Sequence, residues 1–83
     1  MKVTVRYFAS IREAIGQGSE AVETSAATLG ALRDELIARG GAHASSLARG
    51  RAVRMALNQA LSDESATVAD GAEVAFFPPV TGG

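Results

Sequence analysis

The last six residues, Pro78-Pro79-Val80-Thr81-Gly82-Gly83, are suited to an arm that carries a carboxylate into another protein. The two prolines fix φ and keep the backbone extended, so the arm leaves the fold stiffly. The terminal glycines lack Cβ and fit a channel that excludes larger residues. Six extended residues reach about 20 Å, enough to enter a partner's active site.

The alternative interpretation of these six residues is a frayed terminus, which composition alone favours. The order of the residues, with Phe76 and Phe77 before the prolines, argues against it.

The other residues that could do chemistry form no catalytic or metal-binding pattern. The chain has no cysteine, which excludes disulfides, thiolate metal sites and a thiol nucleophile. Its one histidine, His43, cannot form a His-rich site, and we assign it a structural or solvated role. The glycines match no phosphate-binding loop. The carboxylates occur in adjacent pairs typical of charged surface: Asp34 with Glu35, and Asp63 with Glu64. We therefore expect no metal site and no catalysis by this chain alone.

Length and charge restrict the class of protein. Eighty-three residues allow one domain, and 47% apolar with 20% charged residues is typical of a globular one. The net charge of −1 and the scattered basic residues provide no patch for nucleic acid. No segment has the apolar length of a signal peptide or a membrane span. We expect a cytoplasmic protein with its native N-terminus that binds neither nucleic acid nor membrane.

Alternation of apolar and polar residues predicts the strands that must position the arm. Residues 2–9 alternate, with Phe8 as a large apolar exception on the polar face. A short helical segment over 10–16 and a weaker strand over 19–24 suggest a hairpin with a wide loop. Further strands are expected at three places: 52–57, 60–61 and, after an Asp70-Gly71 turn, 73–77.

One segment has clear helical periodicity. Leu29, Leu32 and Leu36 share a helical face, Thr28 is a candidate N-cap, and Gly40-Gly41 is a stop signal. Residues 42–48 are compatible with a further short helical turn. The leucine stripe should pack on the sheet, with polar residues on the opposite side of the helix: Arg33, Asp34 and Arg39.

A single main helix covers one face of such a sheet, so the other face should be open. In the last strand, Phe76 shares its face with Val74 and is expected in the core. An apolar patch on a sheet face is typical of a binding surface. If the first, third and last strands are neighbours, the open face collects four apolar side chains: Phe8, Ala56, Ala75 and Phe77.

Three features together resemble the small subunit of molybdopterin synthase. They are the opening stretch 3–9 followed by Arg12-Glu13, the Asn58-Gln59 step, and the run from Asp70-Gly71 to the end of the chain. The resemblance spans the whole chain, and the C-terminal run is its most specific part. It implies an α+β, ubiquitin-like β-grasp fold with a mixed sheet, a domain over 1–77 and an extended functional tail over 78–83. Ala72 departs from the acidic residue usual in that family, and we expect no functional effect at this turn position.

The resemblance also implies a role for Gly83. In that family the terminal carboxylate is adenylated with ATP by a ubiquitin-activating-like enzyme and converted to a thiocarboxylate with sulfur from an external donor. The sulfur then builds the dithiolene of molybdopterin in the large synthase subunit. No cofactor is expected on the chain itself. Contacts with these partners are expected from the patch and the tail: Phe8, Phe77, Pro78, Pro79, Val80, Thr81 and Gly82.

Other functions fit the same tail. A ubiquitin-like protein modifier would join its terminal glycine to lysines of target proteins. A thiamine-pathway sulfur carrier is a further alternative, which the Phe77-Pro78-Pro79 sequence disfavours. An interaction domain with an inert tail is the remaining one. The modification found on the tail, a thiocarboxylate or an isopeptide bond, separates a carrier from a modifier.

Overall fold

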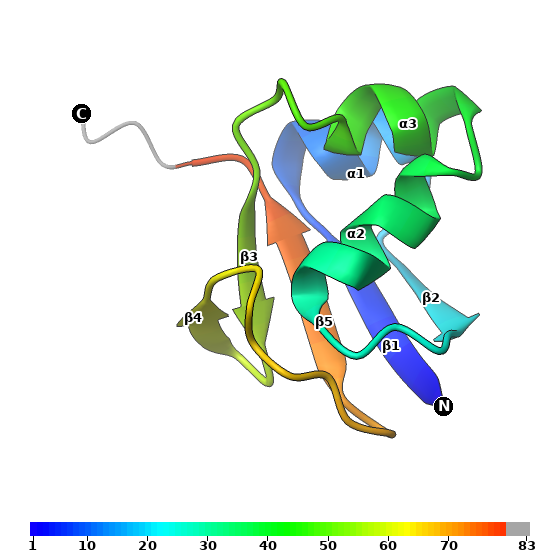
Figure 1. The fold of residues 1–83 in the computed structure, drawn as a ribbon. Coiled ribbons are helices and arrows are strands. Elements are labelled where there is room, and N and C mark those ends of the chain that lie inside the picture. Colours follow the sequence, from blue (N-terminus) through cyan, green and yellow to red (C-terminus); the bar gives the residue numbers. More distant parts are fainter. Residues whose placement is uncertain (80–83) are drawn as a thin grey trace.

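The computed structural model describes residues 1–79 and consists of one mixed sheet with helices packed against it (Figure 1). The sheet has the strand order β2-β1-β5-β3-β4. The central strands β1 and β5 run parallel, and the other neighbouring pairs are antiparallel. The predicted neighbourhood of the first, third and last strands is therefore confirmed. The strands span these residues: β1 Lys2–Tyr7, β2 Ser19–Glu23, β3 Arg54–Leu57, β4 Ala60–Ser62 and β5 Glu73–Phe77.

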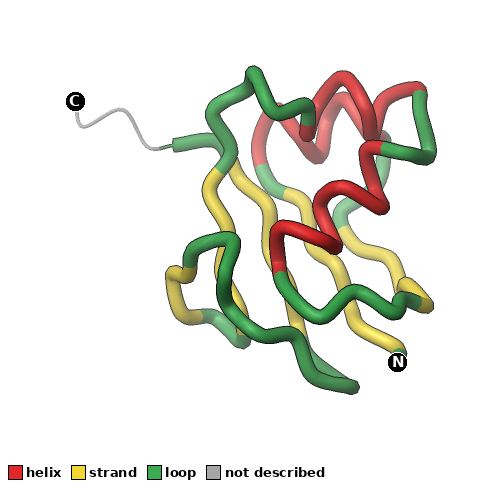
Figure 2. The backbone as a smooth tube through the Cα atoms, viewed as in Figure 1, coloured by secondary structure: helices red, strands yellow, loops and turns green. Residues whose placement is uncertain are grey.

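Three helices belong to the same layer: α1 (Ala9–Ile15), α2 (Leu29–Ile37) and α3 (Gly41–Leu47). In Figure 2, the red helical segments lie together, α2 in front of the sheet and the other two at its upper end. The sequence predicted α2 as the main helix and the other two as short helical segments, which the structure confirms. In residues 1–79, no helix has both the length and the apolar character needed to span a membrane.

The predicted helix signals have clear structural counterparts. The Thr28 hydroxyl accepts a hydrogen bond from the Ala31 amide at 3.2 Å, so Thr28 is the N-cap of α2. Gly40 and Gly41 have φ values of 77° and 56°, which favour glycine. They follow α2, which ends at Ile37, and they also begin α3, because Gly40 is its N-cap.

The first strand ends earlier than the alternation predicts. The expected strand over 2–9 stops at Tyr7, and Ala9 begins α1 with φ 53°. The Phe8 backbone is extended, and its carbonyl accepts hydrogen bonds from the Ile11 and Arg12 amides. These hydrogen bonds begin a helix at residues where the alternation of apolar and polar side chains still predicts a strand.

The core lies between the helices and the sheet. The leucine stripe of α2 is buried there, as predicted, with Val74 and Phe76 of β5. Ala72 closes the predicted turn, since its amide donates to the Ala69 carbonyl at 3.1 Å, and its side chain is only 4% exposed and joins this core. The position therefore belongs both to the turn and to the core.

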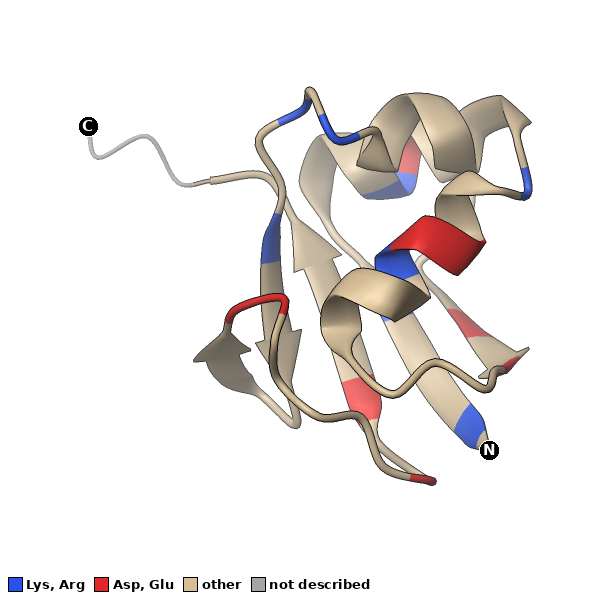
Figure 3. Ribbon diagram, in the orientation of Figure 1, with Lys and Arg blue, Asp and Glu red and all other residues tan. Residues whose placement is uncertain are grey.

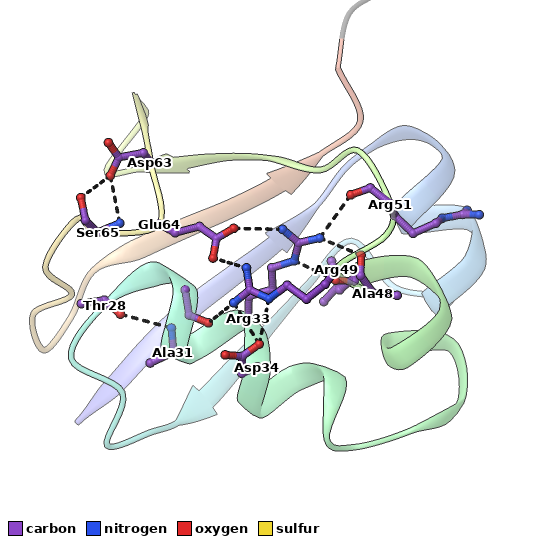
Figure 4. Close-up of polar contacts among 12 residues, drawn as sticks. Thr28, Ala31, Arg33, Asp34, Ala48, Arg49, Arg51, Asp63, Glu64 and Ser65 are labelled. Carbon is purple, nitrogen blue, oxygen red and sulfur yellow. Dashed lines mark hydrogen bonds and ion pairs between the residues drawn. The ribbon is translucent and has the colours of Figure 1, made fainter.

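The prediction that Arg33 lies on the polar face of α2, away from the core, is wrong, because the residue is only 4% exposed. Its Nε donates to the Leu47 carbonyl at 2.7 Å, and Nη2 donates to the Ala48 carbonyl at 2.8 Å (Figure 4). These carbonyls lie at the end of α3, where a helix leaves acceptors without partners. Burial lowers the pKa of the Arg33 guanidinium. Arg33 therefore fastens α2 to the end of α3.

The acidic pairs lie at the surface, as predicted, with Asp34, Glu35 and Asp63 exposed and Glu64 half-buried. Asp34 and Glu64 both pair with Arg49, and Glu64 also contacts Arg33 at 3.4 Å (Figure 4). Hydrogen bonding to Glu64 raises the pKa of Arg49. Gly30 allows this approach, because a Cβ there would lie 2.9 Å from Glu64 Oε1. The loop after β4 is thereby held against α2.

Candidate functional site

An open groove of about 670 Å³ lies on the sheet face opposite the core. Ala75 and Phe77 of β5 face it, because they alternate with the buried Val74 and Phe76. Pairing across the sheet places Ala56 of β3 opposite Ala75. The groove is lined by ten residues: Arg6, Phe8, Ala9, Ala56, Gln59, Glu73, Ala75, Phe77, Pro78 and Pro79.

Phe8 forms one wall of the groove. It follows β1, remains extended before α1, and leaves 39% of its surface exposed. Its amide donates to the Phe76 carbonyl at 3.2 Å, which ties it to the end of β5. The Arg6 guanidinium lies 5.2 Å from the Phe8 ring centroid, a cation–π arrangement. The four residues predicted for an open apolar face, Phe8, Ala56, Ala75 and Phe77, are thus brought together.

The groove is continuous with the start of the tail. Pro78 and Pro79 line it directly after β5. The other predicted tail residues, Val80, Thr81, Gly82 and Gly83, lie outside the described residues. The apolar surface therefore lies at the base of the segment that was predicted to carry the reactive carboxylate.

Sequence reasoning missed Leu61, the most exposed large apolar side chain in residues 1–79, at 63%. Leu61 pairs with Ala56 across β3 and β4, so the two side chains lie on the same face. Asn58 and Gln59 have positive φ values of 49° and 69° and form a two-residue hairpin turn. The signal in the sequence was Asn58, because asparagine is common in such turns. Such a turn fixes the register and would have placed Leu61 beside the groove.

Glu20 organises a polar cluster away from the groove. Its carboxylate accepts hydrogen bonds from Tyr7 Oη at 2.7 Å and Arg39 Nη1 at 2.6 Å, and contacts His43 Nε2 at 2.9 Å. Burial alone would raise the pKa of Glu20, but the bonds from Arg39, His43 and Tyr7 outweigh it and lower the pKa to about 2. Burial raises the pKa of Tyr7. His43 has the structural role assigned to it, joining α3 to β1 and β2.

Glu20→Gln is expected to change how stability depends on pH. The folded-state pKa of about 2 lies below the ordinary 4.5, so the unfolded chain binds a proton first as the pH falls. The stabilisation is complete above pH 4.5 and is lost toward pH 2. At about 1.4 kcal/mol per pKa unit, a shift from 4.5 to about 2 corresponds to a contribution of roughly 3 kcal/mol. Urea unfolding at pH 6, 4.5 and 3 measures it; equal pH dependence of both proteins contradicts the assignment.

The fold and the groove together define a class of protein: a ubiquitin-like β-grasp domain with an apolar surface beside its C-terminal tail. The family model that matches the chain covers residues 5–83 and is that of the ThiS family. The chain therefore belongs to the ThiS family. A molybdopterin synthase sulfur carrier subunit from Haemophilus influenzae is 41% identical over 81 residues, covering 98% of this chain and 99% of the relative.

Solved structures agree with this assignment. A chain from the complex of subunits 1 and 2 of molybdopterin-converting factor from Helicobacter pylori matches with 29% identity and a TM-score of 0.68, over 100% of both chains. SAMP1 from Haloferax volcanii, a small archaeal modifier protein, matches with 26% identity and a TM-score of 0.78, also over 100% of both chains. The same fold thus occurs in proteins described as a synthase subunit and as a modifier.

Proposed function

We propose that this chain is the sulfur-carrier subunit of a molybdopterin synthase and that its reactive group is the carboxylate of Gly83. The observation that carries this proposal is the similarity to two sulfur carrier subunits, which extends over nearly the whole of this chain and of each relative. The groove at the base of the tail adds a physical reason, because a carrier must be held by a partner while its end reacts.

The chemistry begins with activation of the carboxylate. A carboxylate is a poor acyl donor, because neither oxygen is a good leaving group. Attack of the Gly83 carboxylate on the α-phosphorus of ATP releases pyrophosphate and forms an acyl adenylate, in which AMP can leave. The ATP belongs to the activating enzyme, and we propose no cofactor on this chain.

Sulfur must then come from an external donor, because the chain has no cysteine. A sulfide-level nucleophile displaces AMP and leaves a thiocarboxylate on Gly83. The thiocarboxylate sulfur then bonds to a pterin precursor, and water cleaves the bond between this sulfur and the acyl carbon of Gly83. The sulfur stays on the pterin and the carboxylate is restored, so the carrier can be used again. A dithiolene contains two sulfur atoms, and one thiocarboxylate supplies one, so each molybdopterin requires two charged carriers.

The proposed partner for the groove is the large synthase subunit. The Helicobacter pylori complex supports this choice, since subunit 1 of that factor binds subunit 2. The proposed contact surface consists of the groove walls and the first tail residues: Phe8, Phe77, Pro78 and Pro79. The remaining predicted contacts, Val80, Thr81 and Gly82, would extend it along the tail toward the reaction site. We propose the cytoplasm as the compartment, where ATP is available for activation.

Mass spectrometry of the intact chain tests the proposal. The protein is incubated with ATP, a ubiquitin-activating-like adenylating enzyme and a sulfide donor, and its mass should increase by the difference between one sulfur and one oxygen. Addition of the large subunit and the pterin precursor should return the mass to its starting value while molybdopterin forms. A control without ATP should remain unchanged. A charged carrier that yields no molybdopterin would contradict the proposed pathway.

A ubiquitin-like modifier is the second candidate, favoured by the likeness to SAMP1. It predicts a different product, an isopeptide bond between Gly83 and a lysine of another protein. Trypsin cuts after Lys or Arg, and the last such residue of this chain is Arg54. Tryptic peptides of other proteins that carry residues 55–83 on a lysine, after expression in the source cells, would therefore support the modifier. A thiamine-pathway carrier would instead deliver sulfur to a thiazole precursor and not to the pterin.

A further inference from the structure

A basic recess adjoins the apolar groove on the α1 side. It has a volume of about 450 Å³ and is lined by Arg6, Tyr7, Phe8, Arg12, Gly18 and Ser19. Arg6 and Phe8 line both the recess and the groove. No acidic residue of the described chain lines the recess, although it contains two guanidinium groups. A ligand for this recess would therefore be an anion beside an apolar contact.

Arg12 is an exposed residue whose side chain passes beside the Gly18 backbone. Its side chain crosses Gly18, where a Cβ would lie 3.3 Å from Arg12 Nε and 3.6 Å from Cζ. The Gly18 carbonyl accepts a hydrogen bond from the Tyr7 amide at 2.9 Å, which fixes that backbone beside β1. The absence of a side chain at Gly18 leaves room for the Arg12 guanidinium in the recess.

The charge of Arg12 has no internal partner in residues 1–79. No carboxylate of the described chain lies within ion-pair distance of it, and its neighbour Glu13 points elsewhere on α1, because adjacent helical residues do not face each other. Arg6 differs, since it pairs with Glu73 at 3.9 Å and lies over the Phe8 ring. In Figure 3 the acidic positions of the sheet lie on β2 and at the start of β5, away from the end of β5 where the tail begins.

We infer that the recess binds a carboxylate side chain of the large subunit, next to that subunit's apolar contact with the groove, and that Arg12 is its main ligand. This inference rests on the proposed function. The planar guanidinium suits a two-pronged contact with a carboxylate. The recess is partly open to solvent, so the pair sets orientation and association rate in addition to affinity.

The test compares binding of the large subunit to the wild type, Arg12→Gln, Arg12→Lys and Lys2→Gln. Lys2 is an exposed cation at the opposite end of β1 from Phe8, so it controls for loss of overall charge. At about 0.05 M salt we expect Arg12→Gln to weaken binding about ten-fold, chiefly through slower association, while Lys2→Gln stays near wild type. Arg12→Lys should be intermediate, because lysine keeps the charge without the planar geometry.

The salt dependence separates charge from packing. The difference between wild type and Arg12→Gln should shrink to about two-fold at 0.5 M salt, where exposed charges are screened. A defect that is equal at both salt concentrations, or an Arg12→Gln variant that binds like Lys2→Gln, overturns the inference. If the wild type does not bind the large subunit at all, the proposed function fails as well. If it binds normally and only the Arg12 comparison fails, the proposed function survives.

A charge-reversal experiment identifies the partner group. Arg12→Glu should bind more weakly than Arg12→Gln, because it repels the proposed carboxylate. Acidic residues around the apolar contact surface of the large subunit are then changed one at a time to lysine. One of these changes should restore binding of Arg12→Glu and weaken that of the wild type. Absence of any such reciprocal pair contradicts a carboxylate in the recess.

Discussion

A chain shortened by removal of Gly83 is expected to fold like the wild type and to form no molybdopterin. The shortened chain still ends in a glycine carboxylate, now on Gly82, so its chemistry is unchanged. The carboxylate is nevertheless withdrawn by about 3.3 Å, which exceeds the displacement that positioned chemistry tolerates. A glycine added after Gly83 should be equally inactive, because it moves the acid beyond the reacting groups and places a peptide bond where the acid should be.

The experiment supplies each variant with ATP, activating enzyme and sulfur donor, and then with the large subunit and pterin precursor. Thermal unfolding of all three proteins should coincide within error, because the core residues lie between Val3 and Phe76. Mass spectrometry after the first step shows whether the defect is in charging or in transfer. If the shortened chain forms molybdopterin at the wild-type rate, the tail does not act as an arm of defined length.

Much of the fold follows from local pattern in the sequence. Alternation in β1 and β5 and the leucine stripe of α2 assign the core correctly, because burial of apolar surface dominates these choices. The same alternation predicts Ala75 and Phe77 on the open face. Ala75 and Phe77 lie near Phe8 only if the first and last strands are neighbours in the sheet. The parallel pairing of β1 with β5 confirms that they are.

The failed prediction for α2 concerns Arg33, a polar side chain whose partners are distant in the sequence. Arg33 is buried because carbonyls at the end of α3, 14 and 15 residues away, accept its hydrogen bonds. Glu20, for which the sequence made no prediction, likewise has its low pKa because Arg39 and His43 reach it from 19 and 23 residues away. No local pattern encodes such pairs, so a charged residue on a helix is read as solvent-exposed. Leu61 differs, because the hairpin turn before it was a local signal that could have been used.

Phe77→Asp is expected to lose binding but remain folded, whereas Phe76→Asp is expected to unfold, although the two residues are adjacent. Phe77 is half-buried and lines the groove, so its replacement should leave the fold intact and remove binding to the large subunit. Aromatic residues at the centre of an interface often contribute 2 kcal/mol or more, and about 1.4 kcal/mol corresponds to a ten-fold change in affinity. A loss of at least about thirty-fold is therefore expected, and calorimetric titration measures it.

Phe76 is fully buried, with 0% of its surface exposed, and stacks on Tyr7 with ring centroids 6.3 Å apart. Loss of a core phenylalanine costs about 3 to 5 kcal/mol, and an unpaired carboxylate in the core adds a further desolvation cost. A small domain has roughly 5 to 15 kcal/mol of stability in total, so Phe76→Asp should be largely unfolded.

Circular dichroism and thermal unfolding distinguish the two variants. A folded Phe77→Asp that binds as the wild type does would show that the large subunit does not cover the groove. A folded Phe76→Asp would show that the two faces of β5 are assigned the wrong way round.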